Sequence, residues 1–220
     1  MISIIMSVFN NSKTLDRCIN SIINQDYVDF QFLIMDDCST DSSLSILKNY
    51  ENKDSRIKVY KNKKNIGLTK SLNILISQSE GEYIARQDAD DYSSKNRLTI
   101  QLDFLKNKSL DACTSRSKII STGKARPGLS YYLPIKLLTK YKNPFIHGSL
   151  LIKRKVLNEV GNYDEDFYYS QDYKLFSDLL KIGYKVNTIN KYLYYLNIEN
   201  NISSKNKKEQ AYYAKLVKSL

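Results

Sequence analysis

Hydrophobic and polar positions follow a repeating order of strand, loop and helix through the first 107 residues. Four short apolar runs, each ended by polar or acidic residues, predict buried strands at Ile2–Phe9, Phe30–Met35, Ile57–Lys61 and Tyr83–Arg86. Between and after them, apolar residues recur at helical spacing. Four such units predict βαβ crossovers and therefore an α/β fold with a Rossmann-like, mainly parallel sheet flanked by helices.

The first predicted helix has the clearest signals at its ends. Ser12 follows a polar turn and is the expected N-cap, and the apolar spacing continues to Asn24. Later apolar faces are expected around Leu44–Leu47, Leu68–Ile76 and Asn96–Lys106.

After residue 110 the alternation loosens. Apolar pieces stand at Ile119–Ile120 and Leu150–Ile152, and helical spacing returns at Leu175 and Leu179. No stretch has the composition of a linker, so we expect one domain over 1–220, regular to about 107 and irregular over about 108–204. Residues 205–220 are lysine-rich and predict a basic amphipathic helix with the apolar positions Ala211, Tyr212, Leu216 and Leu220. A solvated terminal helix is the alternative.

Composition narrows the class of protein. A chain of 220 residues with 42% hydrophobic and 26% charged residues has the balance of a globular domain, which excludes disordered and fibrous classes. The formal charge of +11 favours an anionic partner, which is nucleic acid, a membrane surface or a phosphate-bearing substrate. Codon usage in an AT-rich genome would explain the abundant lysine equally well.

Reactive residue types are few. The three cysteines are far apart and predict neither a zinc site nor a disulfide framework, so a reduced, cytosolic compartment is expected. His147 is the only histidine, which excludes metal sites built from several histidines. No export leader or membrane-length apolar run is visible, and we expect a soluble or peripheral protein. Carboxylates are left to carry any metal or acid–base chemistry.

Acidic clusters follow two of the predicted strands. Asp36-Asp37 comes after the second strand and Asp88-Ala89-Asp90-Asp91 after the fourth. Because ligands of open parallel sheets bind beyond the carboxyl ends of the strands, both clusters are expected in one crevice. Mg²⁺ or Mn²⁺ is commonly held by one or two carboxylates together with substrate phosphates. The pattern therefore predicts a nucleotide-diphosphate substrate.

Taken together, the motifs resemble the inverting family 2 glycosyltransferases with the GT-A fold, nucleotide-sugar enzymes common in bacterial polysaccharide assembly. The match covers about residues 2–196 and is carried, in the family's order, by Ser3–Asn10, Met35–Asp41, Asn65–Leu68, Gly81–Asp91, Gly161–Glu165 and Ser170–Leu175. The chain has Ser7 and Cys38 where many relatives have proline and glycine. Gln171 stands where an acidic residue usually precedes the family's general base.

This resemblance implies a role for individual residues. It makes residues 1–107 the nucleotide-sugar-binding half and 108–204 the acceptor half. The implied nucleotide contacts are Ser7, Phe9, Asn10, Asp37, Asn65, Gly67 and Asp88, with Asp37 on the base and Asp88 near the ribose. Asp90 is implied to bind the metal and Asp172 to act as the general base. His147 and Gln171 are expected near the acceptor or the diphosphate.

The implied function is transfer of a sugar from a nucleotide-diphosphate donor, with UDP as the commonest nucleotide, to a hydroxyl of a saccharide or lipid-linked saccharide. Mg²⁺ or Mn²⁺ is the implied cofactor. A lipid-linked acceptor would suit a cytoplasmic protein whose basic helix contacts the anionic inner face of the cell membrane. No nucleic-acid partner is expected, and the sequence leaves the oligomeric state open.

Other interpretations remain at this stage. A nucleotidyltransferase would need a glycine-rich loop after its first strand, and residues 7–14 contain no glycine. A non-enzymatic basic protein that binds nucleic acid or membrane would use the charge alone. His147 and Ser149 suggest a serine hydrolase, but no nucleophile-elbow motif is present. His147 as a plain buried histidine, and Asp172 as a simple helix cap, are the structural alternatives.

Overall fold

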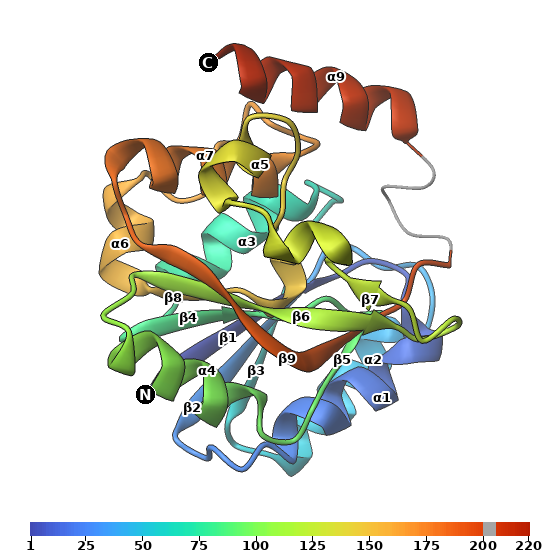
Figure 1. The fold of residues 1–220 in the computed structure, drawn as a ribbon. Coiled ribbons are helices and arrows are strands. Elements are labelled where there is room, and N and C mark those ends of the chain that lie inside the picture. The colour runs from blue at the N-terminus through green and yellow to red at the C-terminus, as the bar shows by residue number, and fades with distance from the viewer. Residues whose placement is uncertain (200–205) are drawn as a thin grey trace.

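In the part of the chain that the structure describes, one nine-stranded sheet has the order β3-β2-β1-β4-β8-β6-β9-β5, with β7 paired to β6 (Figure 1). The computed structural model describes residues 1–199 and 206–220. The strands are β1 Ile2–Val8, β2 Phe30–Asp36, β3 Ile57–Lys61, β4 Tyr83–Arg86, β5 Tyr92–Ser93, β6 Ala112–Ile119, β7 Ala125–Arg126, β8 Leu151–Lys153 and β9 Val186–Leu196.

The four N-terminal strands are parallel. β1 lies between β2 and β4, with Ile2 opposite Phe30 on one side and Tyr83 on the other, and β3 pairs parallel to β2. The prediction of a parallel, Rossmann-like half is therefore confirmed. Parallel strands end at the same edge of the sheet, so the loops that follow β1, β2 and β4 meet there.

Helices cover both faces of this sheet. The α-helices are α1 Ser12–Ile23, α2 Ser43–Lys53, α3 Leu68–Ser77, α4 Arg97–Asn107, α5 Ile135–Thr139, α6 Arg154–Glu159, α7 Gln171–Ile182 and α9 Lys207–Ser219, and the 3₁₀-helices are η1 Leu129–Tyr132 and η2 His147–Ser149. Because side chains alternate along a strand, Ile4 packs in the core cluster with α1, α2 and α4, whereas Ile5 packs with α3, α6 and α7. Strands buried on both faces explain the continuous apolar runs of the sequence.

The second half joins the sheet through antiparallel strands. β8 pairs antiparallel with both β4 and β6, and β9 pairs parallel with β6 through an irregular register near Arg116. β5, which follows the acidic loop after β4, pairs with the far end of β9. As a result, β9 brings residues near position 194 back to the end of β4.

Several local predictions were wrong by small amounts. β1 ends at Val8 rather than Phe9, and β2 continues to Asp36. The residue at the N-cap of α1 is Asn11 rather than Ser12, because the Ser12 N–H donates to Asp41 Oδ2 at 3.1 Å. A loop distant in sequence therefore supplies the capping acceptor that the local pattern placed on Ser12.

A helix over Lys207–Ser219 is present at the predicted position. Tyr212, Leu216 and Leu220 are exposed, and Val217 is the buried residue of α9. The first expected residue, Lys205, and the end of the predicted acceptor half at 200–204 lie outside the described residues. Within residues 1–199 and 206–220, no helix is long and apolar enough to span a bilayer.

Gly81 is expected to be essential to the packing of β4 against β1. A Cβ there would lie 2.5 Å from the backbone nitrogen of Ser3 and 2.9 Å from the carbonyl carbon of Ile2. Backbone cannot move aside as a side chain can, so Gly81→Ala should lower the free energy of unfolding by about 1–3 kcal/mol. Urea denaturation measures this. Gly128→Ala is the matched control, because its nearest atom would be 3.9 Å away, and equal stability of the two variants would contradict the packing.

Candidate active site

The loop after β1 forms one wall of the carboxyl edge. Asn10 has a left-handed backbone with φ of 53°, and its Oδ1 accepts the N–H of Thr40 at 2.8 Å. Its own N–H donates to Ser39 Oγ at 3.1 Å. Asn10 therefore orders the loop after β2, and Phe9 beside it leaves an aromatic side chain 46% exposed at the rim. Ser7 lies just inside, partly exposed in β1.

Asp37 organises the turn that precedes α3. Its Oδ1 accepts the Asn62 side-chain amide at 2.8 Å and the Ile66 N–H at 2.9 Å, and its Oδ2 accepts the Gly67 N–H at 2.8 Å. The residue is 2% exposed. These charge-assisted bonds fix the backbone of the turn, so that the exposed Asn65 lies next to Gly67 at the same edge as Asp37.

Gly67 meets a side chain from the acceptor half. Its φ of 87° favours glycine, and a Cβ added there would lie 2.8 Å from Cε2 of Tyr168. The Tyr168 ring thus covers this turn while the residue stays 54% exposed. The nucleotide-binding turn predicted from sequence is in contact with the segment that leads into α7.

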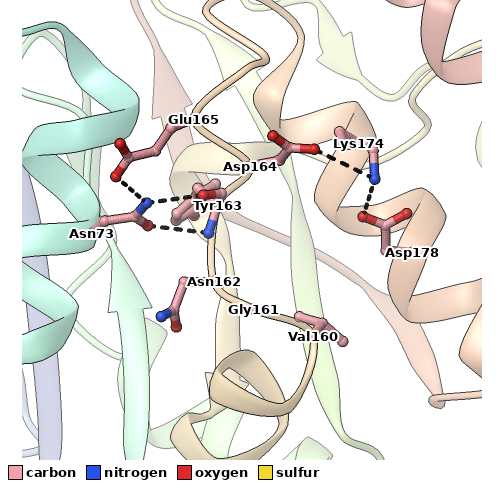
Figure 2. Close-up of a pocket in the computed structure, with 9 residues that line it drawn as sticks. All are labelled: Asn73, Val160, Gly161, Asn162, Tyr163, Asp164, Glu165, Lys174 and Asp178. Atoms are coloured by element: carbon pink, nitrogen blue, oxygen red, sulfur yellow. Dashed lines mark hydrogen bonds and ion pairs between the residues drawn. The ribbon is translucent and has the colours of Figure 1, made fainter.

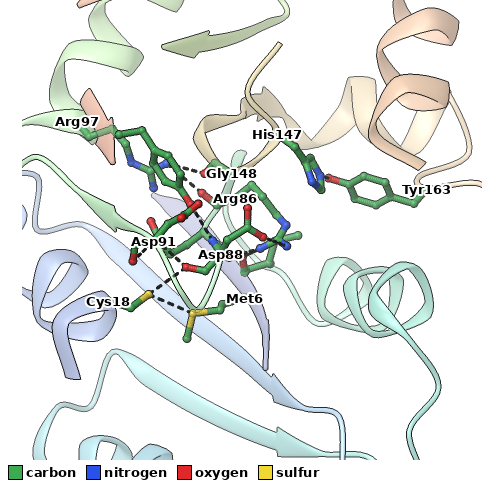
Figure 3. A network of polar contacts seen from close by, with 12 residues as sticks. Met6, Cys18, Arg86, Asp88, Asp91, Arg97, His147, Gly148 and Tyr163 are labelled. Atoms are coloured by element: carbon green, nitrogen blue, oxygen red, sulfur yellow. Dashed lines mark hydrogen bonds and ion pairs between the residues drawn. The ribbon is translucent and has the colours of Figure 1, made fainter. Parts of the chain in front are cut away.

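The acidic loop after β4 is held against α1. Cys18 Sγ donates to the carbonyl oxygen of Asp88 at 3.3 Å, and Arg17 Nη2 donates to that of Asp90 at 3.0 Å. Figure 3 shows the Cys18 contact at the base of the network around this loop. The bonds from Arg17 and Cys18 on α1 therefore fix the backbone of the acidic loop.

Three carboxylates are crowded in this loop. Burial and the charge of Asp88 raise the pKa of Asp90 to about 6. Burial also raises the pKa of Asp91 well above its usual range, although its Oδ1 accepts the Asn197 N–H at 2.6 Å. Each carboxylate disfavours the ionised form of the next, and a bound cation would relieve that repulsion.

Two buried arginines lie behind the acidic loop. Arg86, which is 1% exposed, pairs with Asp88 Oδ1 through Nη2 at 2.5 Å. Arg97 is fully buried and donates through Nη1 to the carbonyl oxygens of Arg86 and Gly148, at 3.0 and 3.2 Å. Burial lowers the Arg97 pKa only to about 10, so Arg97 stays charged at neutral pH. The two arginines offset part of the acidic charge.

Gly148 lets the second half approach Asp88. A Cβ at this position would lie 2.6 Å from Asp88 Oδ2 and would overlap the Tyr194 hydroxyl. That hydroxyl in turn accepts the Asp88 N–H at 2.9 Å. Asp88 is thereby enclosed by η2 on one side and by β9 on the other, as Figure 3 shows for its η2 side.

His147 bonds to a tyrosine rather than to a serine. Its Nε2 lies 2.7 Å from the Tyr163 hydroxyl. Ser149 Oγ donates to the Ile146 carbonyl at 2.9 Å and accepts the Ser115 N–H at 3.0 Å. The interpretation of His147 and Ser149 as parts of a hydrolase triad is therefore wrong.

The electrostatics of His147 report on both halves of the site. Burial of the ring, together with the nearby Arg86 charge, lowers its pKa to about 4. The carboxylates of Asp172 and Asp88 act in the opposite direction. The charges of two carboxylates that are 84 positions apart in sequence thus act on His147, which is neutral at pH 7.

Asp172 is placed in the first turn of α7. Its Oδ2 accepts the Asn143 side-chain amide at 2.7 Å, and Asn143 Oδ1 accepts the Phe145 N–H at 3.0 Å. The two bonds fix the orientation of the Asn143 amide. The expectation that Asp172 simply caps the helix is not supported, because Ser170 occupies the N-cap and no side-chain cap bond forms. Gln171 is buried beside it.

A polar pocket lies next to Tyr163 (Figure 2). It has a volume of about 420 Å³ and is lined by Asn73, Val160, Gly161, Asn162, Tyr163, Asp164, Glu165, Lys174 and Asp178. Asn73 bonds to both the backbone oxygen and the N–H of Tyr163, at 2.9 and 3.1 Å. The pocket contains none of the residues predicted from sequence as functional, but Asn73 holds the Tyr163 backbone.

Sequence reasoning missed the residues that shape the site. Arg86 and Arg97 carried a signal, since a charged residue in an apolar strand or helix needs a buried partner. Gly148 and Tyr194 carried none, because their importance arises only when β9 returns to β4. Asn143 was visible only as part of a turn before Pro144.

The pKa of His147 is directly measurable, because the chain has one histidine and its ring signal in an NMR titration needs no assignment. We expect a midpoint of about 4. An unfolded chain takes up this proton near pH 6.5, so the folded state should lose stability as pH falls from 6.5 to 4. In the Tyr163→Phe variant the His147 ring stays buried, so its midpoint should also lie well below 6.5. A midpoint near 6.5 in the wild type would contradict the enclosed site.

Comparison with known proteins places the chain in a family. The model of the family "Glycosyl transferase family 2" matches residues 3–161. The O-antigen biosynthesis glycosyltransferase WbnJ of Escherichia coli is 33% identical over 187 residues, which are 82% of this chain and 72% of that protein.

Two solved structures share the fold. Staphylococcus aureus TarS 1–349 in complex with UDP-GlcNAc matches with a TM-score of 0.82 and 21% identity over 98% of this chain and 64% of that one. The mannosyltransferase PcManGT of Pyrobaculum calidifontis, in complex with GDP-Man and Mn²⁺, matches with a TM-score of 0.77 and 16% identity over 96% and 61%. The chain thus spans less than two thirds of both structures. The GT-A fold expected from the sequence is confirmed, and the chain belongs to glycosyltransferase family 2.

Proposed function

We propose that this glycosyltransferase moves a sugar from a nucleotide-diphosphate donor to a hydroxyl of a saccharide or lipid-linked saccharide, with inversion at the anomeric carbon. One observation carries the proposal. One short segment contacts a carboxylate from each half of the chain: Asn143 donates to Asp172 Oδ2 at 2.7 Å, and a Cβ on Gly148 would lie 2.6 Å from Asp88 Oδ2. This connection supports the proposal that Asp88 and Asp172 serve one reaction.

The nucleotide occupies the carboxyl edge of β1, β2 and β4 in this proposal. Phe9 offers an exposed aromatic face at the rim, and the turn at Asn65 and Gly67 is held by Asp37. Asp88 is 31% exposed and reaches the ribose. UDP is the proposed nucleotide, supported by the UDP-GlcNAc complex of TarS, which has the same fold.

A divalent cation, Mg²⁺ or Mn²⁺, is proposed at Asp90 with Asp88 beside it. The residues that the structure describes contain no group of three or more His, Cys, Asp and Glu arranged to hold a metal. That composition fits a cation held by one or two protein carboxylates with substrate phosphates as further ligands. Such a cation would offset the negative charge that develops on the leaving diphosphate. The Mn²⁺ in the PcManGT complex supports the choice.

Asp172 is the proposed general base. The acceptor hydroxyl gives its proton to the carboxylate while its oxygen forms a bond to the anomeric carbon. The bond between that carbon and the diphosphate oxygen breaks, and the diphosphate leaves with the electron pair. Asn143 occupies Oδ2, which leaves Oδ1 as the atom directed to the acceptor. The neutral His147 adds no competing charge at pH 7.

The acceptor belongs to the second half of the chain in this proposal. Tyr163 bonds to His147, and Gln171 and Asp172 lie in the first turn of α7. A polysaccharide or its lipid-linked precursor is the proposed class, supported by the O-antigen assignment of WbnJ. A cytoplasmic location is proposed because all three cysteines are free thiols.

Removing the Asp90 carboxylate should weaken cation binding. Electron paramagnetic resonance reports free Mn²⁺ when protein is titrated in the presence of UDP. We expect Asp90→Asn to weaken Mn²⁺ binding by more than about tenfold, since even outer partners of a metal commonly contribute 10- to 100-fold. The exposed Asp103→Asn on α4 is the matched control. Wild-type affinity in the Asp90 variant would remove the assignment.

Asp172→Asn should abolish most of the transfer while sparing donor binding. A positioned base contributes roughly 10²–10⁴ in rate, and the amide cannot accept the proton. Release of UDP in the presence of an acceptor extract measures transfer, and calorimetry measures UDP binding, so the two effects are separated. Asp166→Asn, an exposed residue of the same segment, should behave as wild type. Unchanged turnover in Asp172→Asn would refute the base.

A further inference from the structure

Apolar side chains gather on the surface of two segments close to Asp172. Eight of the seventeen exposed large hydrophobic residues in the described part of the chain lie in residues 129–141 and in α9. They are Leu129, Tyr132, Leu133, Leu137, Tyr141, Tyr212, Leu216 and Leu220. We call this set the apolar surface. Patches of this kind on a soluble fold mark interaction sites.

Each of the two segments is packed against the protein through one buried residue. Leu138 is the buried residue of α5, and Val217 is the buried residue of α9. On α9, Tyr212 and Leu216 are spaced four residues apart and lie on one side of the helix, and Leu220 follows as its C-cap. Leu129 is 88% exposed and Leu220 is 67% exposed. The helix therefore exposes apolar side chains beside its packed residue Val217.

Basic residues accompany the apolar residues in both segments. Residues 124–142 contain Lys124, Arg126, Lys136, Lys140 and Lys142 and no acidic residue. α9 carries Lys207, Lys208, Lys215 and Lys218 against the single acid Glu209. Three of the eight apolar residues are tyrosines, whose rings suit the boundary between water and lipid.

Both segments are tied to the residues next to the proposed base. The Tyr173 hydroxyl donates to the carbonyl oxygen of Thr139, the last residue of α5, at 2.5 Å. The Tyr173 side chain also packs with Val217 of α9. Figure 1 shows α5, α7 and α9 together on one side of the sheet, away from α1, α2 and α4. The apolar surface is therefore connected to the proposed active site through Tyr173, the residue that follows Asp172.

We propose that the apolar surface docks on an anionic lipid bilayer, so that the membrane presents a lipid-linked acceptor to Asp172; the acceptor part rests on the proposed function. A second copy of the chain is disfavoured as the occupant, because it would bring the same cations against these. Nucleic acid would pair with the lysines but leave the leucines exposed. An anionic bilayer takes both kinds of side chain.

The proposal is tested by sedimentation with vesicles of phosphatidylcholine, with and without phosphatidylglycerol. The wild-type chain should bind the anionic vesicles, and high salt should weaken that binding. The pairs Leu133→Gln with Leu137→Gln, and Leu216→Gln with Leu220→Gln, should each lower the partition coefficient at least about tenfold. Val28→Gln with Ile182→Gln is the matched control, because these residues are 68% and 61% exposed elsewhere.

The charge contribution has its own control. Lys140→Gln with Lys142→Gln should reduce binding at low salt by roughly 10- to 30-fold, since a lysine near an anionic membrane contributes about a fivefold factor. Lys106→Gln with Lys108→Gln removes equal charge from the exposed end of α4 and should change binding little. Circular dichroism and the unfolding midpoint verify that each variant folds.

Vesicle binding requires neither donor nor acceptor. A chain that does not bind vesicles would therefore contradict the docking proposal without contradicting the proposed function. Asp172→Asn should bind vesicles as the wild type does. Three results would overturn the docking proposal: no preference for anionic vesicles, equal binding by the leucine variants, or self-association that those same variants abolish. The last would assign the surface to a contact between copies of the chain.

Discussion

The crowding of Asp88, Asp90 and Asp91 at the end of β4 is the constraint on which the site depends. Carboxylates in a partly buried loop are costly to ionise, and burial together with the charge of Asp88 raises the pKa of Asp90 to about 6. Arg86 and Arg97 offset part of it from below, and the loop is fixed to α1 through backbone contacts. The fold therefore holds three neighbouring aspartates at the end of β4, and carboxylate oxygens are the ligands that Mg²⁺ and Mn²⁺ prefer.

The two halves of the chain are joined by contacts at the carboxyl edge of the sheet. Tyr194, near the end of β9, accepts the Asp88 N–H, and Gly148 is close enough that a methyl group would overlap the same tyrosine. Tyr168 lies over Gly67 on the other side of the edge. The N-terminal half and the second half of the chain thus share contacts at this edge. β9, whose Tyr194 contacts Asp88, and β4, which leads into the acidic loop, belong to one sheet.

The sequence predicted the regular half well and the second half poorly, for physical reasons. β1–β4 are buried on both faces, so their apolar runs and the acidic residues that end them were readable locally. The N-cap at Asn11 and the packed face of α9 depend on distant partners, which local patterns do not contain. The acidic loop was found from charge alone, whereas the contacts of Gly148, Tyr194 and Asn143 are long-range and leave no local signal. The role of Asp172 came from family resemblance, and the structure connects Asp172 to the acidic loop through the segment from Asn143 to Gly148.

Thermal unfolding with UDP, GDP, dTDP and CDP, each in MnCl₂ and in EDTA, tests the central claim most directly. The account predicts that one nucleotide, most simply UDP, raises the midpoint only when Mn²⁺ is present. At 100 times its dissociation constant a ligand stabilises by about 2.7 kcal/mol, which is roughly 5 to 10 °C for a chain of this length. No shift with any nucleotide in MnCl₂, or the same shift in EDTA, would contradict a cation-dependent donor site at the acidic loop.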